Sequence, residues 1–491
     1  EVVAFNSNKE GLETRIKMFV IKQENGVWVI PPYNFPAEAK VRLAKTAASM
    51  IGIKRGALVS RLKSDQKKYQ VGDPLQFDAN TLPLESLGNR ITLKGKGEAV
   101  LTDMIIGKEH PVRKGLYYVR HPHEDAIWLS QLNIDISTKF SDWINADLLG
   151  ISGDDIRTVE IKQYALDKKQ RLPKIEETNL LSRTSRKTPW EFKGIKKKTE
   201  EIQLPHVNEF LNQLTGIKII GVRKKPQGLN ADLSIDQKII QNQAHLNQIQ
   251  IDLAEKGFFL GEGKNGQLTL LPHETEIVAT TKDGIAYDLY FGQLFTGTEY
   301  DIEVGFTNKK KDTSKKENLP KEELKKSRYL FVTARFDIDV LEEIPDKPKK
   351  PSEPKEEKKK EEKEPEKKES KKENKDTSNS NKKKPEEKKK ASPSPKEVFQ
   401  KELDKYNSDL IQYKKEIKEY EKKIEEGLKK VDQLNSKFEQ WYYVISAESF
   451  ENLRLTRKDL VKTKSKKKEK LSSPISPPKG LPPGFKIPDF K

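Results

Sequence analysis

The chain of 491 residues contains no cysteine and only three methionines. The lack of cysteine excludes disulfides, thiolate zinc sites, iron–sulfur clusters and thiol nucleophiles. Long hydrophobic runs are also missing, because no stretch reaches the roughly 18 consecutive apolar residues that a membrane-spanning helix needs. Only 34% of the residues are hydrophobic whereas 35% are charged, so we expect part of the chain not to fold. The chain begins at Glu1 rather than at a methionine, and we therefore expect a leading segment to have been removed.

The net charge of +18 is concentrated in three low-complexity segments. Residues 308–327, 346–395 and 454–491 carry net charges of +4, +6 and +9, so the rest of the chain is close to neutral. A nucleic-acid-binding face is expected on a folded surface, with aromatic side chains between the charges. Solvated spacers are therefore the favoured interpretation, and we expect no nucleic-acid partner.

Short β-rich runs and turn signals predict an α+β fold. The first strands are predicted at 2–5, 16–21 and 27–30, and Asn25-Gly26 is a strong hairpin signal between the last two. A helix is predicted at 37–50, with Pro36 at its first turn and Gly52 just after its end. Further strands are predicted at 90–93, 101–106, 116–120, 126–129 and 157–161.

The same pattern then recurs along the chain. A second helix at 204–214 ends in Gly-Ile-Lys, as the first helix does, and four other segments echo earlier ones: 189–192 echoes 28–30, 281–291 echoes 105–107, 328–332 echoes 117–120, and Lys-Phe-x-x-Trp occurs at both 139–143 and 437–441. We predict two repeated small sheet-plus-helix modules, the first at 1–165 and the second at 166–341 plus 434–463. Chance similarity between two unrelated α+β domains is the alternative.

A long insertion interrupts the predicted second module. Residues 346–395 form a Lys/Glu/Pro-rich tract that we expect to be a disordered linker, and residues 464–491 are expected to be a disordered basic, Pro-rich tail. Residues 396–438 are predicted to form a long amphipathic or coiled-coil helix. Its apolar positions alternate spacings of four and three, and these eight residues, called the seam below, are Phe399, Leu403, Tyr406, Leu410, Tyr413, Ile417, Tyr420 and Ile424.

The seam is the predicted interaction surface, with two alternatives for what covers it. The helix docks on its own module or forms an antiparallel hairpin, which four aromatic residues on one edge favour, or it pairs with another chain or a second copy. Gly427 is interpreted as a break in the register, after which Leu428, Val431, Leu434 and Phe438 resume one residue later.

The candidate catalytic and ligand-binding motifs each favour a structural interpretation. His121-Pro122-His123-Glu124-Asp125 has metal-ligand residue types, but it lies between two predicted strands where a polar turn is expected. Residues 261–266 have the spacing Gly-x-Gly-x-x-Gly, but a strand rather than a helix follows, which predicts a hairpin loop. The sequence contains no phosphate-binding loop, Gly-x-Ser-x-Gly or His-Glu-x-x-His motif. We predict no catalytic residues, no metal and no cofactor, and therefore no enzyme.

Several segments together resemble bacterial proteins of domain-of-unknown-function family 4340, and the charged insertion resembles that of planctomycete members. These segments are Ile30-Pro31, 36–44, Gly72-Asp73-Pro74, 105–108, 116–120, 137–143, 328–332 and 441–446, so the resemblance covers nearly the whole chain outside the low-complexity tracts. It implies a protein with an N-terminal membrane helix, missing from this sequence, and an extracytoplasmic part beside the cytoplasmic membrane. Some members are associated with auxiliary components of ABC-type transporters, and the family has no established activity or catalytic residues.

We therefore expect a non-catalytic envelope protein that binds protein partners near an ABC-type transport system, with ABC transporter auxiliary or permease subunits as candidates. The alternative function is a nucleic-acid or anionic-surface binder that uses the Lys-rich tails, whose affinity would fall steeply with salt. A hydrolase with a site between the modules is a third alternative, which buried carboxylates with shifted pKa values in a cleft would favour.

Overall fold

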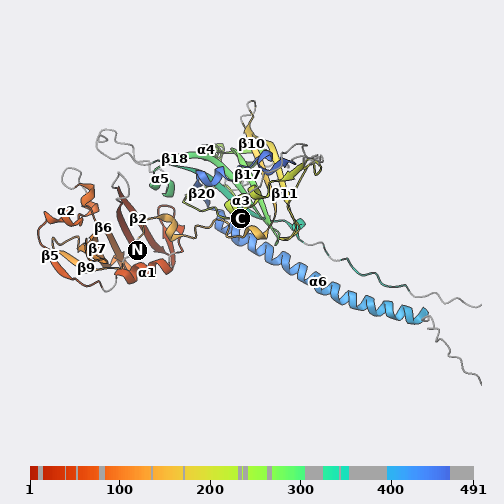
Figure 1. Cartoon of the computed structure of the whole chain (residues 1–491), viewed down its shortest axis with the longest axis horizontal. Coiled ribbons are helices and arrows are strands. Elements are labelled where there is room, and N and C mark those ends of the chain that lie inside the picture. Colours follow the sequence, from red (N-terminus) through yellow and green to blue (C-terminus); the bar gives the residue numbers. More distant parts are fainter. Residues whose placement is uncertain are drawn as a thin grey trace, which may run out of the picture.

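The computed structural model describes residues 1–8, 15–38, 40–50, 53–76, 83–133, 137–167, 169, 172–230, 235, 242–262, 268–304, 324–341, 344, 346–352 and 395–464. The architecture is mixed α+β, as predicted, with two large antiparallel sheets and one long helix that extends away from them (Figure 1). Most of the predicted linker and almost all of the predicted tail lie outside the described residues.

The first sheet has nine strands in the order β4-β3-β2-β1-β6-β7-β8-β9-β5. Asn25 and Gly26 form the tight turn between β2 and β3 with φ values of 48° and 82°, as the hairpin signal predicts. The strands are β1 (Val2–Asn8), β2 (Arg15–Glu24), β3 (Val27–Ile30), β4 (Phe35–Pro36), β5 (Ala57–Ser60), β6 (Asn89–Lys94), β7 (Val100–Glu109), β8 (Leu116–Arg120) and β9 (Ile127–Gln131).

The second sheet has eight strands in the order β12-β11-β10-β17-β18-β19-β20-β14. Its strands are β10 (Ile156–Leu166), β11 (Pro173–Ser182), β12 (Glu191–Phe192), β14 (Gly221–Lys224), β17 (Thr275–Thr281), β18 (Ile285–Gly297), β19 (Lys325–Phe336) and β20 (Trp441–Ser446). Two further sheets have two strands each: β13 (Glu200–Ile202) pairs with β21 (Val461–Thr463), and β15 (Phe258–Glu262) pairs with β16 (Leu268–Pro272).

The helices differ greatly in length. They are α1 (Lys40–Met50), α2 (Asp65–Tyr69), α3 (Leu204–Thr215), α4 (Gln243–Glu255), α5 (Glu299–Val304), α6 (Pro395–Phe438), α7 (Ala447–Glu451) and α8 (Arg457–Leu460). Short 3₁₀ helices are η1 (Pro74–Gln76), η2 (Leu84–Ser86), η3 (Lys96–Glu98), η4 (Phe140–Trp143), η5 (Gly153–Asp155) and η7 (Ile338–Val340). The predicted helices at 37–50 and 204–214 correspond to α1 and α3.

The two sheets have the same strand order. In this comparison β10, β11 and β12 correspond to β1, β2 and β3, the strands β17 to β20 correspond to β6 to β9, and β14 corresponds to β5. The two orders then coincide, except that the first sheet has the additional short strand β4. In each sheet one helix, α1 or α3, precedes the edge strand β5 or β14 in the chain. Each of these helices contributes buried side chains to one shared hydrophobic core.

The two sheets also have a β-bulge at the corresponding place. The pairing of β7 with β8 shifts between Ile106 and Glu109, and the pairing of β18 with β19 shifts between Phe291 and Leu294. Gly107 and Gly292 each follow the first residue of their bulge. A Cβ atom at either glycine would lie 2.3 Å from a backbone oxygen, that of Tyr69 or that of Lys256, so both positions require glycine.

At each bulge glycine, the nearby backbone oxygen belongs to a short connection that lies on one face of the sheet. Tyr69 is the last residue of α2, and Lys256 directly follows α4. The apolar residues that follow, Val71 and Phe258, are fully buried and belong to separate small cores on that face. Each sheet is therefore covered on both faces, which antiparallel sheets of this size do not require.

One continuous hydrophobic core joins the two sheets. The rings of Phe35 and Trp441 lie 4.9 Å apart, and Phe19 stacks on Trp143 with ring centroids 5.3 Å apart. An ion pair with a Lys17 Nζ to Glu303 Oε1 distance of 2.8 Å crosses from β2 to α5 beside these rings. Burial of these large apolar side chains couples the positions of the two sheets.

Two details of the predicted modules differ in the structure. Residues 157–161, predicted as the last strand of the first module, lie in β10 of the second sheet, which pairs with β17. The two Lys-Phe-x-x-Trp segments are not at corresponding places, because 139–143 follows β9 whereas 437–441 precedes β20. Phe140 and Trp143 are buried in the core that joins the sheets, so that motif serves the junction rather than a repeated element.

Replacement of either bulge glycine by alanine is expected to destabilise the protein. Gly107→Ala and Gly292→Ala should each lower the free energy of unfolding by about 1–3 kcal/mol, because the new Cβ would overlap a backbone oxygen that cannot rotate away. Urea denaturation measures the change. Gly153→Ala is the matched control, since its Cβ would meet its nearest neighbour, Leu211 Cβ, at an ordinary 3.6 Å. Unchanged stability of both bulge variants would contradict the proposed close approach.

Candidate functional site

The long helix α6 has two parts with different surroundings. Its last turns, residues 427–438 and called the docked segment below, pack on β18 and β19 of the second sheet through the buried side chains of Val431, Leu434 and Phe438. Asn435 anchors this segment, because its side-chain amide donates to Ala334 O and its Oδ1 accepts from Ala334 N, both at 2.8 Å.

Gly427 continues the register of the helix instead of breaking it. It lies three residues after Ile424 and four before Val431, so the alternation of three and four runs unbroken to Phe438. Gly427 is buried, and a Cβ there would lie 2.2 Å from Phe336 Cε2, whereas Leu428 is 49% exposed. The interpretation of a register break is therefore wrong, because glycine is needed where the helix crosses a phenylalanine ring.

All eight seam residues lie on the same face of α6 as the docked segment. Each is half-buried, and none belongs to a hydrophobic core formed by the described residues. Figure 1 shows this part of α6 extending well away from both sheets. Within the described residues, docking on the chain's own module is thus limited to residues 427–438 of the helix, and the seam is only half-buried.

Salt bridges along α6 lie on faces other than the seam. Lys415 and Lys422 approach Glu419 and Glu426, each four residues further on, at 4.0 and 3.6 Å. Such exposed pairs contribute only about 0.2–0.5 kcal/mol each. A stripe of eight half-buried aromatic and aliphatic residues outside any hydrophobic core of the described residues indicates an interaction site.

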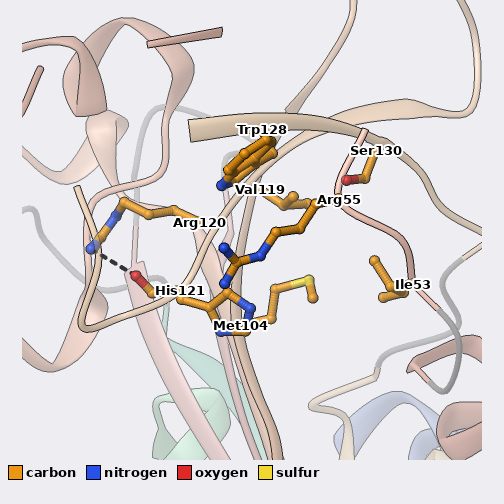
Figure 2. Close-up of a pocket in the computed structure, with 8 residues that line it drawn as sticks. All are labelled: Ile53, Arg55, Met104, Val119, Arg120, His121, Trp128 and Ser130. Atoms are coloured by element: carbon orange, nitrogen blue, oxygen red, sulfur yellow. Dashed lines mark hydrogen bonds between the residues drawn. The ribbon is translucent and has the colours of Figure 1, made fainter. Parts of the chain in front are cut away.

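A small cavity of about 100 Å³ lies on the core-facing side of the first sheet (Figure 2). Its lining is partly polar: the Arg55 guanidinium lies over the Trp128 ring, 5.4 Å from the ring centroid, and points toward His121. His121 Nδ1 is 3.0 Å from Asp103 O. The buried Trp128 Nε1 has no hydrogen-bond partner among the described residues.

The corresponding place in the second sheet is filled by α6. When the two sheets are aligned at their bulges, the strand registers show that Trp128 of β9 corresponds to Tyr443 of β20. Tyr443 is fully buried and donates its hydroxyl to Lys437 O at the end of α6, with an oxygen–oxygen distance of 3.2 Å. In the first sheet the short turn between β8 and β9 stands in place of that helix, which leaves the cavity. No pattern in the sequence pointed to Arg55 or Trp128.

The residues with metal-ligand chemistry serve the fold. Residues 121–125 form the predicted polar turn, closed by a hydrogen bond from Glu124 N to His121 O of 3.1 Å, and Glu124 also pairs with Arg55 at 2.7 Å. No group of three candidate ligands occurs among the described residues. Gly261 lies in β15, which pairs with β16 as the predicted hairpin requires, and residues 263–267 lie outside the described residues.

One carboxyl group in the second sheet has a markedly shifted pKa. Burial raises the pKa of Asp288 to about 6, and Arg335, whose Nε is 3.2 Å from Asp288 Oδ2, only partly offsets the shift. Asp288 lines neither the cavity near Trp128 nor the one formed beside Lys430 and Leu434.

The comparisons with known proteins concern mainly the first half of the chain. Residues 28–234 match the family described as Domain of unknown function (DUF4340), which confirms the family resemblance over that span. The match runs from β3 past β14 and includes α1 and α3. No curated protein and no solved structure matches the chain. Among the described residues, no helix is both long and apolar enough to span a membrane.

Replacement of Gly427 by alanine is expected to destabilise the docked segment. Alanine favours a helix by about 1 kcal/mol over glycine, but the new Cβ would overlap the Phe336 ring, and we expect a net loss of about 1–3 kcal/mol in the free energy of unfolding. Ser436→Ala, at an exposed position of the same segment, is the control and should not destabilise the protein. A more stable Gly427→Ala variant would show that the helix does not cross Phe336 closely.

Asp288→Asn is expected to raise stability in a pH-dependent way. The folded-state pKa of about 6 exceeds the usual value of 3.8, so the folded protein prefers the protonated carboxyl and loses stability as the pH rises between these values. The variant should match the wild type below about pH 4 and exceed it above pH 6 by up to about 3 kcal/mol. Thermal unfolding at pH 4, 6 and 8 measures this. A difference that shrinks as the pH rises would contradict it.

Proposed function

We propose that this chain, which carries a DUF4340 domain over residues 28–234, is a non-catalytic protein-interaction component of the cell envelope. The observation that carries the proposal is the seam, an apolar face held away from both sheets by a helix whose other end is firmly docked. A rigid arm with an uncovered apolar face is suited to binding an apolar surface of another protein.

The family resemblance supplies the proposed cellular setting. It favours a full-length protein that is anchored in the cytoplasmic membrane, faces the extracytoplasmic side, and acts near an ABC-type transport system. In this setting the transporter's auxiliary or permease subunits are the candidate partners. The part of α6 before the docked segment, residues 395–426, would extend the reach of the protein by about 48 Å at 1.5 Å per residue.

The finer fold proposal is that the two sheets are two copies of one module, the second interrupted by the linker and α6. The shared strand order and the paired bulge glycines Gly107 and Gly292 support it. The insertion then occupies the place of the short turn between β8 and β9. In this proposal the first copy retains the compact turn and the second copy acquired the interaction arm.

Capture from lightly crosslinked native membranes tests the proposed function. The tagged full-length gene product should recover envelope or transporter subunits, and the recovery should resist nuclease and high salt. Leu410→Asp places a charge in the seam and should abolish it, whereas Ile411→Asp, at the neighbouring position that is 71% exposed and outside the seam, should not.

Two results would overturn the proposal. Recovery of ribosomal or nucleoid proteins that nuclease releases, and that is lost when Lys466, Lys467 and Lys468 are replaced by glutamine, would favour the alternative nucleic-acid or anionic-surface function. Recovery of the same envelope subunits with Leu410→Asp as with the wild type would show that the seam is not the interaction surface.

A further inference from the structure

The cavity beside Lys430 and Leu434 lies where the docked segment of α6 meets the second sheet. Its volume is about 160 Å³, and its other walls come from residues 149–155 and from residues 281–287, which span the turn between β17 and β18. We propose that this cavity, called the base cavity below, binds a primary alkylammonium group and thereby holds the docked segment on the sheet.

The hydroxyl of Tyr287 is a buried polar group that lacks a partner in the base cavity. The side chain lines the cavity and is only 2% exposed, yet its hydroxyl makes no hydrogen bond with any residue that the structure describes. A buried hydroxyl left in this way is unfavourable, and Tyr443 on the same face shows the usual arrangement, because its hydroxyl donates to Lys437 O. The Tyr287 hydroxyl is therefore available to a ligand.

The carboxylates that line the base cavity determine the charge of the ligand. Lys282 Nζ lies 3.0 Å from Asp155 Oδ1 but 3.9 Å from Asp283 Oδ2, so Asp283 is the more weakly paired of the two. Burial and the charge of Asp283 raise the pKa of Tyr287 to about 12, which shows that this carboxylate acts on the Tyr287 hydroxyl. A ligand group that meets both must be a cation that donates hydrogen bonds, as an ammonium group does.

Lys430 carries a positive charge on the α6 wall of the base cavity but does not reverse this preference. Its side chain is exposed and makes no ion pair with the described residues, so the flexible chain can extend into solvent. Asp283 is less free to move, because its turn is closed by a hydrogen bond of 3.1 Å from Gly284 N to Thr281 O.

Apolar side chains form the remaining walls and favour a short hydrocarbon chain on the ligand. They are Leu149, Ile151, Ile285 and Leu434. An apolar cavity of about 150 Å³ accommodates a six-carbon ring, so a straight chain of about four or five carbons with its ammonium group fits. Free alkylamines have this chemistry, and so does the lysine side chain, which has four methylene groups before its nitrogen.

The ligand would connect α6 to the sheet, because Lys430 and Leu434 belong to the docked segment. Undocking of this segment removes one wall of the base cavity, so the ligand binds the docked form preferentially. Binding therefore stabilises the docked segment and, through the continuous helix, the orientation of the seam. The inference goes beyond the proposed function, since the base cavity and the seam are different sites.

Calorimetric titration of the full chain with n-butylammonium chloride, at an ionic strength matched with potassium chloride, tests the site. We expect saturable binding of n-butylammonium and none of n-butyrate, which has a similar size and the opposite charge. Tyr287→Phe should weaken binding about tenfold by removing a hydrogen bond to a charged group, and Asp283→Asn about threefold, because that carboxylate is 66% exposed. Absence of saturable binding, or equal binding of n-butyrate, would overturn the proposal.

Three measurements on the variants separate the site from general effects of charge and stability. Asp154→Asn removes a nearby carboxylate that does not line the base cavity and should leave binding unchanged. Lys430→Gln should strengthen binding about twofold, whereas an anion site would be weakened by it. Tyr287→Phe should unfold at the wild-type temperature, because the hydroxyl it loses has no partner among the described residues. Unchanged binding in this variant would contradict the proposed role of Tyr287.

Two further experiments identify the source of the ammonium group and its effect on α6. Nα-acetyl-lysine amide that binds as tightly as n-butylammonium would assign the site to lysine side chains of proteins, and weaker binding would assign it to free amines. At n-butylammonium concentrations of ten times Kd, amide hydrogen exchange in residues 427–438 should slow about tenfold. Binding without slower exchange there would overturn the coupling to the docked segment.

Discussion

Asn435 on α6 pairs with the backbone of Ala334 as a neighbouring strand would, and this contact determines what the rest of the helix can do. β20 pairs with β19 only over Ser327–Leu330, so Ala334 lies beyond the end of β20. The amide of Asn435 satisfies both backbone groups there and thereby fixes the height and rotation of α6 on the sheet. Because the helix is continuous, that rotation also determines which face the seam presents to solvent.

The same place in the first sheet differs because none of the described helices covers it. There the short turn at His121 leaves a cavity, and Trp128 Nε1 has no hydrogen-bond partner within the part of the chain that the structure describes. In the second sheet the end of α6 covers the corresponding Tyr443, and Lys437 O accepts a hydrogen bond from its hydroxyl. The core-facing sides of both sheets belong to one hydrophobic core. The end of α6 therefore docks on an apolar surface that the second sheet itself provides.

Local patterns in the sequence predicted the elements well and some spatial relations poorly. Asn25-Gly26 and the apolar face of 204–214 act within a few residues, so they identify a hairpin and a helix directly. The repeated Lys-Phe-x-x-Trp was misleading, because 139–143 follows β9 whereas 437–441 precedes β20, although both tryptophans are buried in the core that joins the sheets. Gly427 misled for a similar reason: its role depends on Phe336, about ninety residues earlier in the sequence, which no local pattern reveals.

The stability of α6 depends on whether another surface covers the seam. Its side-chain pairs each contribute only a few tenths of a kcal/mol, and a helix outside a folded core gains little from propensity alone. Full burial of a single aromatic or aliphatic seam residue contributes about 1.5–3 kcal/mol, which exceeds the contribution of any one of these pairs. Covering the seam is thus the largest stabilising contribution available to the part of α6 beyond the docked segment. Formation of the helix beyond the docked segment and binding of a partner to the seam consequently stabilise each other. The docked segment is the fixed end from which the helix extends.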